Sequence, residues 1–341
     1  MLIASSSVGL GHVARDLHLR RAMGWAKVEW LTSGNALRFL EENGEVVHGA
    51  SRRMRSLGDI IGGSLIRNCA VALRPRALME LYSAVKSNAR VIDESVDLAS
   101  YDLVVADEFW ELLMSEQVPR RGAFITDFVD LSPRLWWAPV RPAVARLGDA
   151  IRARAIERFD LRIHVGMWGE AAGFWHPGQL ITDAASAGPA PARRGPVVIN
   201  TGGTPAACAA ARSISSDLSA RGIDHVVIGA CGELTGNPGP LISRSSALVT
   251  LAGYSSLVEA ALTRKPTIVL PVRRHFEHVE NSRAFEGRSG YRVIQCSRDV
   301  KVADGLLSVL NEDPDPPPVV DATREIGDAL RSLLRREQPR G

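Results

Sequence analysis

Short apolar runs alternate with amphipathic helical patterns along almost the whole chain, and this alternation most restricts how it can fold. Neighbouring parallel strands need long crossover connections, and helices supply them, so the alternation predicts parallel α/β architecture. In the first half we predict strands at Met1–Ala4, Lys27–Leu31, Leu103–Ala106, Ala123–Thr126 and Leu161–Val165. In the second half we predict strands at Val197–Asn200, His225–Gly229, Ala247–Leu251, Thr267–Leu270 and Tyr291–Ile294.

A change of composition separates the two series of strands. Residues 183–196 are rich in Ala, Pro and Gly, which indicates an interdomain linker. We therefore expect one Rossmann-like domain over 1–182 and a second over 197–341, the latter closed by an amphipathic helix at Asp321–Arg335. Ligands of such sheets bind outside the carboxyl ends of the strands, so we expect a binding cleft where the two sheets face each other.

Composition excludes several classes of protein. The net charge of +3 gives no reason to expect nucleic acid binding, and no apolar run approaches the length of a membrane helix. Cys69, Cys208, Cys231 and Cys296 lie far apart and lack zinc-ligand spacing. We expect them to be buried thiols in a reducing compartment, and hence a cytoplasmic protein. The acids that follow the strands form no DxD site, so we expect no metal, and we expect no cofactor.

The stretch "SSSVGLGHVARDL" places two glycines and a histidine between the first strand and the first helix. Gly9 and Gly11 allow a turn that approaches an anion closely, but the lysine of a phosphate loop is missing. His12 stands instead at the carboxyl end of a strand, where it could serve as a general base near neutral pH. The alternative is that His12 caps the helix or bonds the loop.

Acidic residues follow two further strands. Asp107 and Glu108 come directly after Leu103–Ala106, and Asp127 and Asp130 follow the next strand. We name Asp107 and Asp127 as catalytic candidates that could orient His12 or bind acceptor hydroxyls. Solvated loop acids or helix caps are the alternative.

Two glycine turns follow strands in the second half. Gly202, Gly203 and Thr204 lie between a strand and a helix, and so do Gly253, Ser255 and Ser256. Unpaired N–H groups at a helix amino terminus bind anions, so both turns are candidate phosphate sites. Tight strand–helix turns use the same residues without any ligand.

A polar loop follows the strand Thr267–Leu270. It presents Arg273, Arg274, His275, Glu277 and His278, and Asn281 lies one helical turn after Glu277.

The segment from 248 to 286 resembles the nucleotide-sugar half of GT-B glycosyltransferases, above all the MurG-like family 28. The matching positions are Gly253, Ser256, Glu259, Pro266, Pro271, Glu277 and Asn281, whereas His278 and Ser282 depart from the pattern. The resemblance implies that Glu259 binds the ribose and that Arg273–His278 contacts the sugar. It also implies that Gly202–Thr204 lies under the diphosphate and that Ile242 lies beside the uracil.

The amino-terminal loop resembles that of MurG-like enzymes and, more closely, that of the nucleotide-sugar hydrolases of pseudaminic acid synthesis (PseG). Together the resemblances imply a glycosyltransferase that moves a sugar, by family habit an N-acetylhexosamine, from a UDP-sugar to a hydroxyl acceptor with inversion. The acceptor is lipid-linked, a glycan or a small molecule. Two alternatives are a hydrolase that uses water and a nucleotide-sugar-binding module without catalysis.

The stretch Arg52–Arg76 carries six arginines against one acid. We predict an amphipathic helix with solvated arginines. The alternative, which the resemblance suggests, is peripheral contact with the inner face of a membrane. Trp136 and Trp137 are predicted to line an acceptor site or to fill core.

Overall fold

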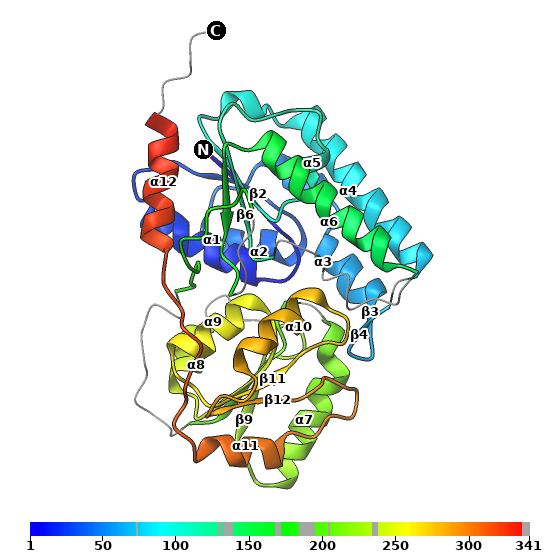
Figure 1. Cartoon of the computed structure of the whole chain (residues 1–341), viewed down its shortest axis with the longest axis vertical. Helices are drawn as coiled ribbons and strands as arrows, with labels where there is room; N and C mark the ends of the chain where they lie inside the picture. The colour runs from blue at the N-terminus through cyan, green and yellow to red at the C-terminus, as the bar shows by residue number, and fades with distance from the viewer. Residues whose placement is uncertain are drawn as a thin grey trace.

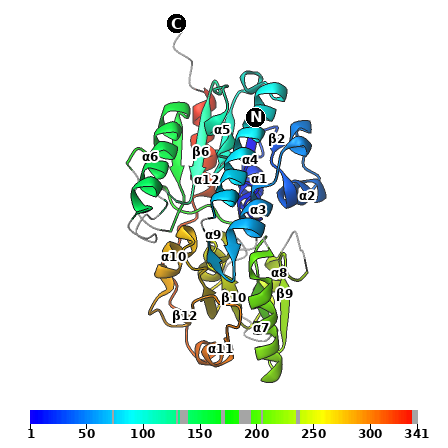
Figure 2. The ribbon, with the colours of Figure 1, turned by 90° about the vertical axis from the view of Figure 1, so that its right-hand side faces the viewer.

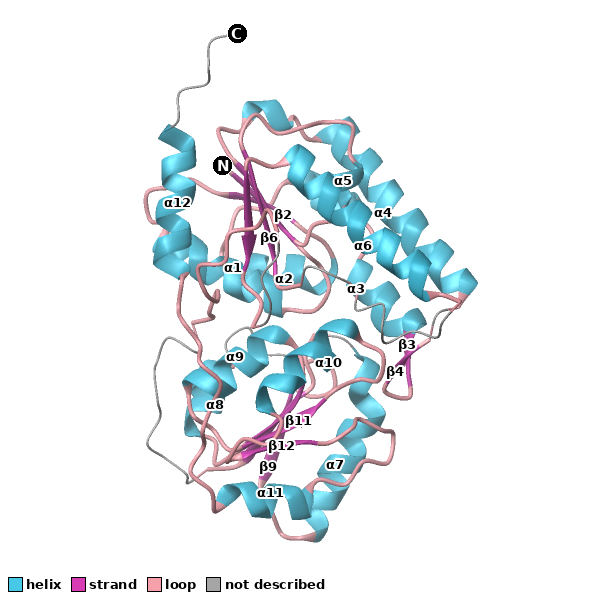
Figure 3. Cartoon of the chain, viewed as in Figure 1, coloured by secondary structure: helices cyan, strands magenta, loops and turns pink. Residues whose placement is uncertain are grey.

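The computed structural model describes residues 1–72, 74–128, 131, 139–167, 172–183, 195–203, 205–233 and 238–335. Two α/β domains lie one above the other along the long axis of the molecule, each with helices on both faces of a parallel sheet (Figures 1 and 3). This architecture confirms the predicted fold class.

The first domain contains a five-stranded sheet in the order β2-β1-β5-β6-β7. Its strands are β1 (Leu2–Ser5), β2 (Glu29–Leu31), β5 (Val104–Asp107), β6 (Gly122–Thr126) and β7 (Leu161–His164). Its helices are α1 (Gly11–Ala22), α2 (Gly34–Glu42), α4 (Pro75–Ser95), η3 (Leu98–Ser100), α5 (Glu111–Met114) and α6 (Arg141–Arg158).

The second domain repeats this plan with the sheet order β12-β11-β10-β8-β9. Its strands are β8 (Val197–Asn200), β9 (His225–Ile228), β10 (Leu248–Leu251), β11 (Thr267–Leu270) and β12 (Tyr291–Val293). Its helices are η6 (Pro205–Ala207), α7 (Cys208–Ala220), α8 (Gly239–Arg244), α9 (Tyr254–Leu262), α10 (Phe276–Ser282), η7 (Arg283–Phe285) and α11 (Ala303–Leu310). All ten predicted strands are confirmed, and their ends agree within two residues.

The chain crosses between the domains twice, and the two crossings run side by side. Gln179 N donates to Val320 O (2.7 Å), and Ala322 N donates to Gln179 O (2.9 Å). The second crossing leads to α12 (Thr323–Arg335), which packs against α1 (Figure 1).

The final helix therefore packs with the first domain, although the sequence places it with 197–341. Ile326, Leu330 and Leu333 are buried in the same hydrophobic core as Leu17 and Met23 of the first domain. The helical spacing of the three residues predicts a buried face, but only the fold decides which surface covers it.

The stretch Arg52–Arg76 does not form the predicted amphipathic helix. It contains the end of η1 (Gly49–Arg53), then α3 (Leu57–Ile60), η2 (Ile61–Leu65), β3 (Ile66–Arg67) and β4 (Ala70–Val71), and it reaches the start of α4. α3 continues directly into η2, a π-helical segment that contains Gly62 and Gly63, and the helix ends where β3 begins at Ile66. Arg52, Arg53 and Arg55 form surface ion pairs with Glu41, Glu94 and Glu80. Among the described residues, no helix is long and apolar enough to cross a membrane.

The β3–β4 hairpin reaches from the first domain onto the second (Figure 2). Its two turn residues, Asn68 and Cys69, have φ angles of 48° and 55°, as a type I′ turn requires. Arg273 N donates to Cys69 O, and Val71 N donates to Arg273 O, both at 2.9 Å. The hairpin thereby fixes the start of the predicted sugar loop.

The prediction of isolated thiols is wrong, because the four cysteines form two disulfides. Cys69 of the hairpin pairs with Cys296 of the second domain, 227 positions away, and Cys208 pairs with Cys231. The sequence conceals both pairs because the partners meet only through tertiary structure. The Cys69–Cys296 bond links the two domains covalently.

We predict that Leu330→Ala lowers the free energy of unfolding by about 2–5 kcal/mol, the usual cost of truncating a buried leucine. Leu330 is fully buried in the first-domain core, so hydrogen exchange should quicken in α1 and not in α7. Denaturant unfolding and exchange mass spectrometry measure both effects. Arg331→Ala, at the next position of α12, is the control. Faster exchange confined to the second domain would contradict the assignment of α12.

Candidate functional site

The glycine loop after β1 lies at the carboxyl end of the first sheet. Gly9 has a φ of +80°, which lets the chain turn into α1. A Cβ on Gly58 would lie 2.1 Å from Ser7 O, so the loop and α3 are in direct contact. The loop delivers His12 to the first turn of α1 with only 8% of the residue exposed.

The imidazole of His12 lies between two acids at the carboxyl end of β5, Asp107 as its last residue and Glu108 directly after it. Its Nδ1 is 3.3 Å from Asp107 Oδ1, and its Nε2 is 3.6 Å from Glu108 Oε2. Burial alone would raise the pKa of Asp107, but the charge of Arg15 and its hydrogen bonds hold that pKa well below its usual value. The structure therefore brings the predicted histidine and its predicted acid together.

Arg15 is the principal site residue that the sequence analysis missed. Its Nε donates to Asp107 Oδ2 (2.7 Å) and its Nη2 to Asp107 Oδ1 (2.5 Å), while Nη1 donates to Asp127 Oδ2 (2.8 Å). Nη2 also lies 2.9 Å from His12 Nδ1. The guanidinium carbon is 4.8 Å from the ring centroid of Tyr254 in α9, so this one side chain contacts both domains.

The acids around Arg15 differ in charge. Glu108 has a φ of +46°, and its Oε1 accepts from Thr126 Oγ1 (3.0 Å) and Asp127 N (2.8 Å). Burial, and then the charge of Asp127, raise the pKa of Glu108 well above its usual value. Burial and Asp107 likewise raise the pKa of Asp16, which lies one helical turn after His12. Asp130 lies outside the described residues.

The glycine loops of the two domains are in contact. A Cβ on Gly203 would lie 2.7 Å from Leu10 N and 2.8 Å from Gly9 Cα. Ser255 Oγ donates to Gly11 O (3.1 Å). A diphosphate between these loops would therefore require the domains to separate.

The other residues predicted to bind phosphate lie close to the contact between the two glycine loops. Gly253 is the N-cap of α9, and Ser256 Oγ in its first turn accepts from Asn200 Nδ2 (3.1 Å). Asn200 Oδ1 in turn accepts from Gly202 N (3.0 Å). Thr204 lies outside the described residues.

Glu277 joins α10 to the amino terminus of α9. Its Oε1 accepts from Tyr254 N at 2.9 Å, and Asn281 Nδ2 lies 3.5 Å from the same oxygen. Burial, and then the charge of Asp127 across the domain interface, raise the pKa of Glu277 to about 8. The predicted acids Asp127 and Glu277 are thus electrostatically coupled.

The two histidines of the polar loop stack on each other, with ring centroids 3.9 Å apart. Burial lowers the pKa of both, that of His275 to about 4, so both rings are neutral near pH 7. His278 Nδ1 lies 3.4 Å from Val272 N, which donates to it. Arg273 remains exposed, with its backbone held by the hairpin.

Two predicted donor residues lie elsewhere in this structure. Glu259 is 4% exposed and accepts from Thr182 Oγ1 (2.5 Å) beside the first domain crossing. Burial raises the pKa of Glu259 to about 7. Ile242 is fully buried in α8, where it packs against Val198 and Leu248. Neither side chain is presented to a ligand in this conformation.

Two groups of described side chains have the composition of a metal site. In each, the candidate ligand atoms lie within 4.8 Å of one another. In His12, Asp107 and Glu108, the Arg15 guanidinium already contacts the Asp107 and His12 atoms that a cation would need. In His275, Glu277 and His278, the stacked imidazole planes cannot direct both lone pairs at one ion without turning. Neither arrangement fits a metal as it stands.

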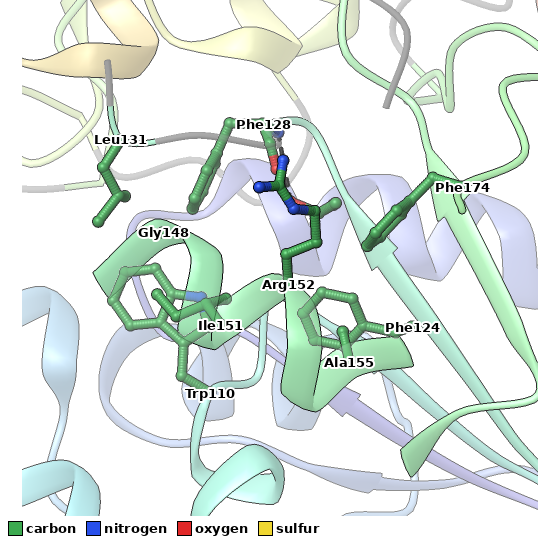
Figure 4. A pocket seen from close by; sticks show the side chains of 10 residues that line it. Trp110, Phe124, Phe128, Leu131, Gly148, Ile151, Arg152, Ala155 and Phe174 are labelled. Carbon is green, nitrogen blue, oxygen red and sulfur yellow. Dashed lines mark hydrogen bonds between the residues drawn. The ribbon is translucent and has the colours of Figure 1, made fainter. Parts of the chain in front are cut away.

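An aromatic pocket lies beside the acid cluster in the first domain (Figure 4). It is lined by Trp110, Phe124, Phe128, Leu131, Ile151, Arg152 and Phe174. Phe128 follows Asp127 and contacts Phe276 of the second domain, with ring centroids 4.6 Å apart. The pocket therefore borders the domain interface. Trp136 and Trp137, the predicted acceptor-site residues, lie outside the described residues.

Two Rossmann-like domains whose glycine loops meet at the carboxyl ends of their sheets define the GT-B fold. SnogD, a glycosyltransferase from Streptomyces nogalater, superposes with a TM-score of 0.53 at 16% identity, over 98% of this chain and 94% of its own. The calicheamicin glycosyltransferase CalG4 gives 0.51 at 16% identity, over 98% and 93%. The spinosyn rhamnosyltransferase SpnG, solved with thymidine diphosphate, gives 0.52 at 13% identity, over 98% and 95%. No family model and no curated protein matches the sequence. At these identities the likeness shows the GT-B fold.

We predict that Gly203→Ala separates the two glycine loops, because the new Cβ would overlap the backbone of Gly9 and Leu10. Small-angle scattering should give a larger radius of gyration, and the melting temperature should fall by several degrees. Gly49→Ala is the control, since a Cβ there meets nothing within 4 Å. An unchanged radius would show that the loops are not in contact in solution.

We predict that Glu277→Gln reduces the loss of stability on raising the pH. The native Glu277 keeps its proton up to a pH of about 8, whereas the unfolded chain releases it near the usual carboxyl pKa. Native stability therefore falls across that interval, and glutamine removes the titration. Melting temperatures between about pH 5 and pH 9 test this. Glu280→Gln on the same helix is the control, and an equal slope in both variants would contradict the assignment.

Proposed function

We propose that the protein is an inverting glycosyltransferase that uses a nucleoside-diphosphate sugar as donor. The observation that supports it most is the placement of His12. The ring lies at the carboxyl end of β1 against Asp107. Its neighbours contact the amino terminus of α9 across the domain interface, because Arg15 lies over the ring of Tyr254 and Gly11 O accepts from Ser255 Oγ. A base on one domain and an anion-binding helix start on the other are what a displacement at the anomeric carbon requires.

The donor would bind mainly to the second domain. The start of α9 with Ser255 and Ser256, and the turn at Gly202–Gly203, would hold the diphosphate with backbone N–H groups and hydroxyls. The polar loop from Arg273 to His278, with Asn281, would contact the sugar. We propose a UDP- or dTDP-sugar, since SpnG has been solved with thymidine diphosphate. Binding of ribose by Glu259 would require its release from Thr182.

The acceptor would approach from the first domain. The aromatic pocket bordered by Phe128 lies next to Asp127 and Glu108, so an acceptor with an apolar body could place a hydroxyl near His12 (Figure 4). His12 would take the hydroxyl proton as the oxygen attacks the anomeric carbon and the nucleoside diphosphate departs. Charge on the leaving group would be stabilised by the helix start, without a metal ion.

Hydrolysis of the nucleotide sugar is the second candidate function. The amino-terminal loop from Ser5 to Leu17 favours it, because this loop resembles the PseG hydrolases more closely than the transferases. The same His12 would then activate water. Rapid release of free sugar without an acceptor would support hydrolysis, whereas strict dependence on an added hydroxyl compound would support transfer.

We predict that His12→Ala lowers turnover roughly a hundredfold or more, the usual contribution of a general base. Affinity for UDP or dTDP should be unchanged, because the diphosphate is assigned to the second domain. Calorimetry with each nucleotide and product analysis with a panel of UDP- and dTDP-sugars provide the measurement. His18→Ala, on the same helix but paired with Asp183, should keep full activity. A His12→Ala protein with an intact rate would overturn the mechanism.

A further inference from the structure

The Arg15 guanidinium restricts which nitrogen of His12 can carry a proton. A guanidinium has N–H donors and no acceptor, and Nη2 lies 2.9 Å from His12 Nδ1. If Nδ1 carried a hydrogen, two N–H groups would face each other at that distance. Hydrogen positions follow from the bonding partners, so the contact requires a lone pair on Nδ1.

Asp107 competes for the same nitrogen from the other side. Asp107 Oδ1 accepts only, and it would favour a proton on Nδ1, but it lies farther away at 3.3 Å. Arg15 already donates to both oxygens of Asp107, which makes that carboxylate a weaker acceptor for a proton on Nδ1. Arg15 Nη2, the nearer of the two groups, therefore determines the tautomer of His12. The ring proton resides on Nε2, which faces Glu108 Oε2 at 3.6 Å.

This tautomer cannot act as the base. The acceptor hydroxyl must give its proton to a free lone pair on Nε2, which requires the ring proton to be on Nδ1 and bonded to Asp107. The two tautomers carry the same number of protons, so the ring stays neutral in both. The change requires Nη2 to withdraw from Nδ1, the Nε2 proton to be released to solvent and a proton from solvent to bind Nδ1.

We propose that Arg15 is a positioning residue that holds His12 in the Nε2–H tautomer until contact with the second domain changes. This inference rests on the proposed role of His12 as base. Arg15 is 1% exposed, and the groups that face it are Asp107, Asp127, Glu108 and the ring of Tyr254.

The contact with Tyr254 connects Arg15 to the proposed donor site. Tyr254 is the first residue of α9, next to Ser255 and Ser256, and its backbone N–H is held by Glu277. A diphosphate seated at this helix start requires the glycine loops to part, which shifts Tyr254 relative to Arg15. The base then becomes available only when the donor is present, which limits wasteful proton transfer in its absence.

The test measures the tautomer directly. Protein labelled with ¹⁵N-histidine has eight ring systems, and loss of one signal set in His12→Ala assigns His12. Nitrogen chemical shifts and long-range proton couplings then tell Nε2–H from Nδ1–H. The free wild-type protein should show Nε2–H, and a spectrum with Nδ1–H would overturn the proposal without any variant.

Arg15→Lys separates positioning from folding. A lysine keeps a positive charge beside Asp107 but is too short to reach His12 Nδ1 as well, so the population should move to Nδ1–H. Arg20→Lys, partly exposed on the same helix, should leave the tautomer unchanged. A merely structural Arg15 would lower the melting temperature of Arg15→Lys and leave the tautomer at Nε2–H, and that result would overturn the proposal.

The effect of ligand is tested with UDP and dTDP added to the wild-type protein. Either nucleotide, at a concentration that saturates the calorimetric titration, should raise the population of Nδ1–H. Saturation without any change of tautomer would overturn the link between Tyr254 and Arg15. The tautomer is measured without turnover, both in the free protein and with added nucleotide. A negative result in either measurement is therefore distinct from a failure to detect glycosyl transfer.

Discussion

The buried guanidinium of Arg15 allows the two domains to pack together where buried acids gather at the carboxyl ends of the strands. Adjacent strands of a sheet lie about 4.8 Å apart, so the acids after β5 and β6 are necessarily close to one another. Asp16, Asp107, Glu108 and Asp127 are all buried, and Glu277 adds a fifth acid from the second domain. Buried charges of one sign are stable only when they are paired or neutralised by protons. Arg15 pairs two of these acids, and burial raises the pKa of Asp16, Glu108 and Glu277, which favours their neutral forms.

Local sequence patterns were sufficient to predict the strands of both sheets. They did not predict the path of Arg52–Arg76 or the domain against which α12 packs. Strands buried on both faces appear as continuous apolar runs, which is why all ten were found. In Arg52–Arg76 the apolar and basic residues suggested one helix, but the glycines allow a path of short elements that packs against the first glycine loop. The apolar face of α12 was evident from its spacing, whereas its partner α1 lies some 300 positions earlier, beyond the reach of any local pattern.

The candidate site was predictable where topology alone brings residues together. Asp107 ends β5, His12 and Asp127 follow β1 and β6, and neighbouring parallel strands end at the same edge of a sheet. Arg15 was missed because arginines also occur at Arg20 and Arg21 of the same helix, and nothing local distinguishes a buried one. The role of Glu259 rested on a family pattern, and the hydroxyl of Thr182 that occupies it lies 77 positions away. The cysteine pairs were concealed for the same reason, since their separations of 227 and 23 residues carry no signal.

Because α12 belongs to the core of the first domain, the second domain is an insertion within the sequence of the first. During synthesis the second sheet is complete while the last part of the first core is still inside the ribosome, so the domain that begins first must finish folding last. Any exchange of the second domain with that of a related protein, in evolution or in the laboratory, therefore needs two junctions, one near each crossing. A chimaera joined at a single point after β7 would carry the α12 of the other protein. The apolar face of that helix evolved to pack on a different first domain.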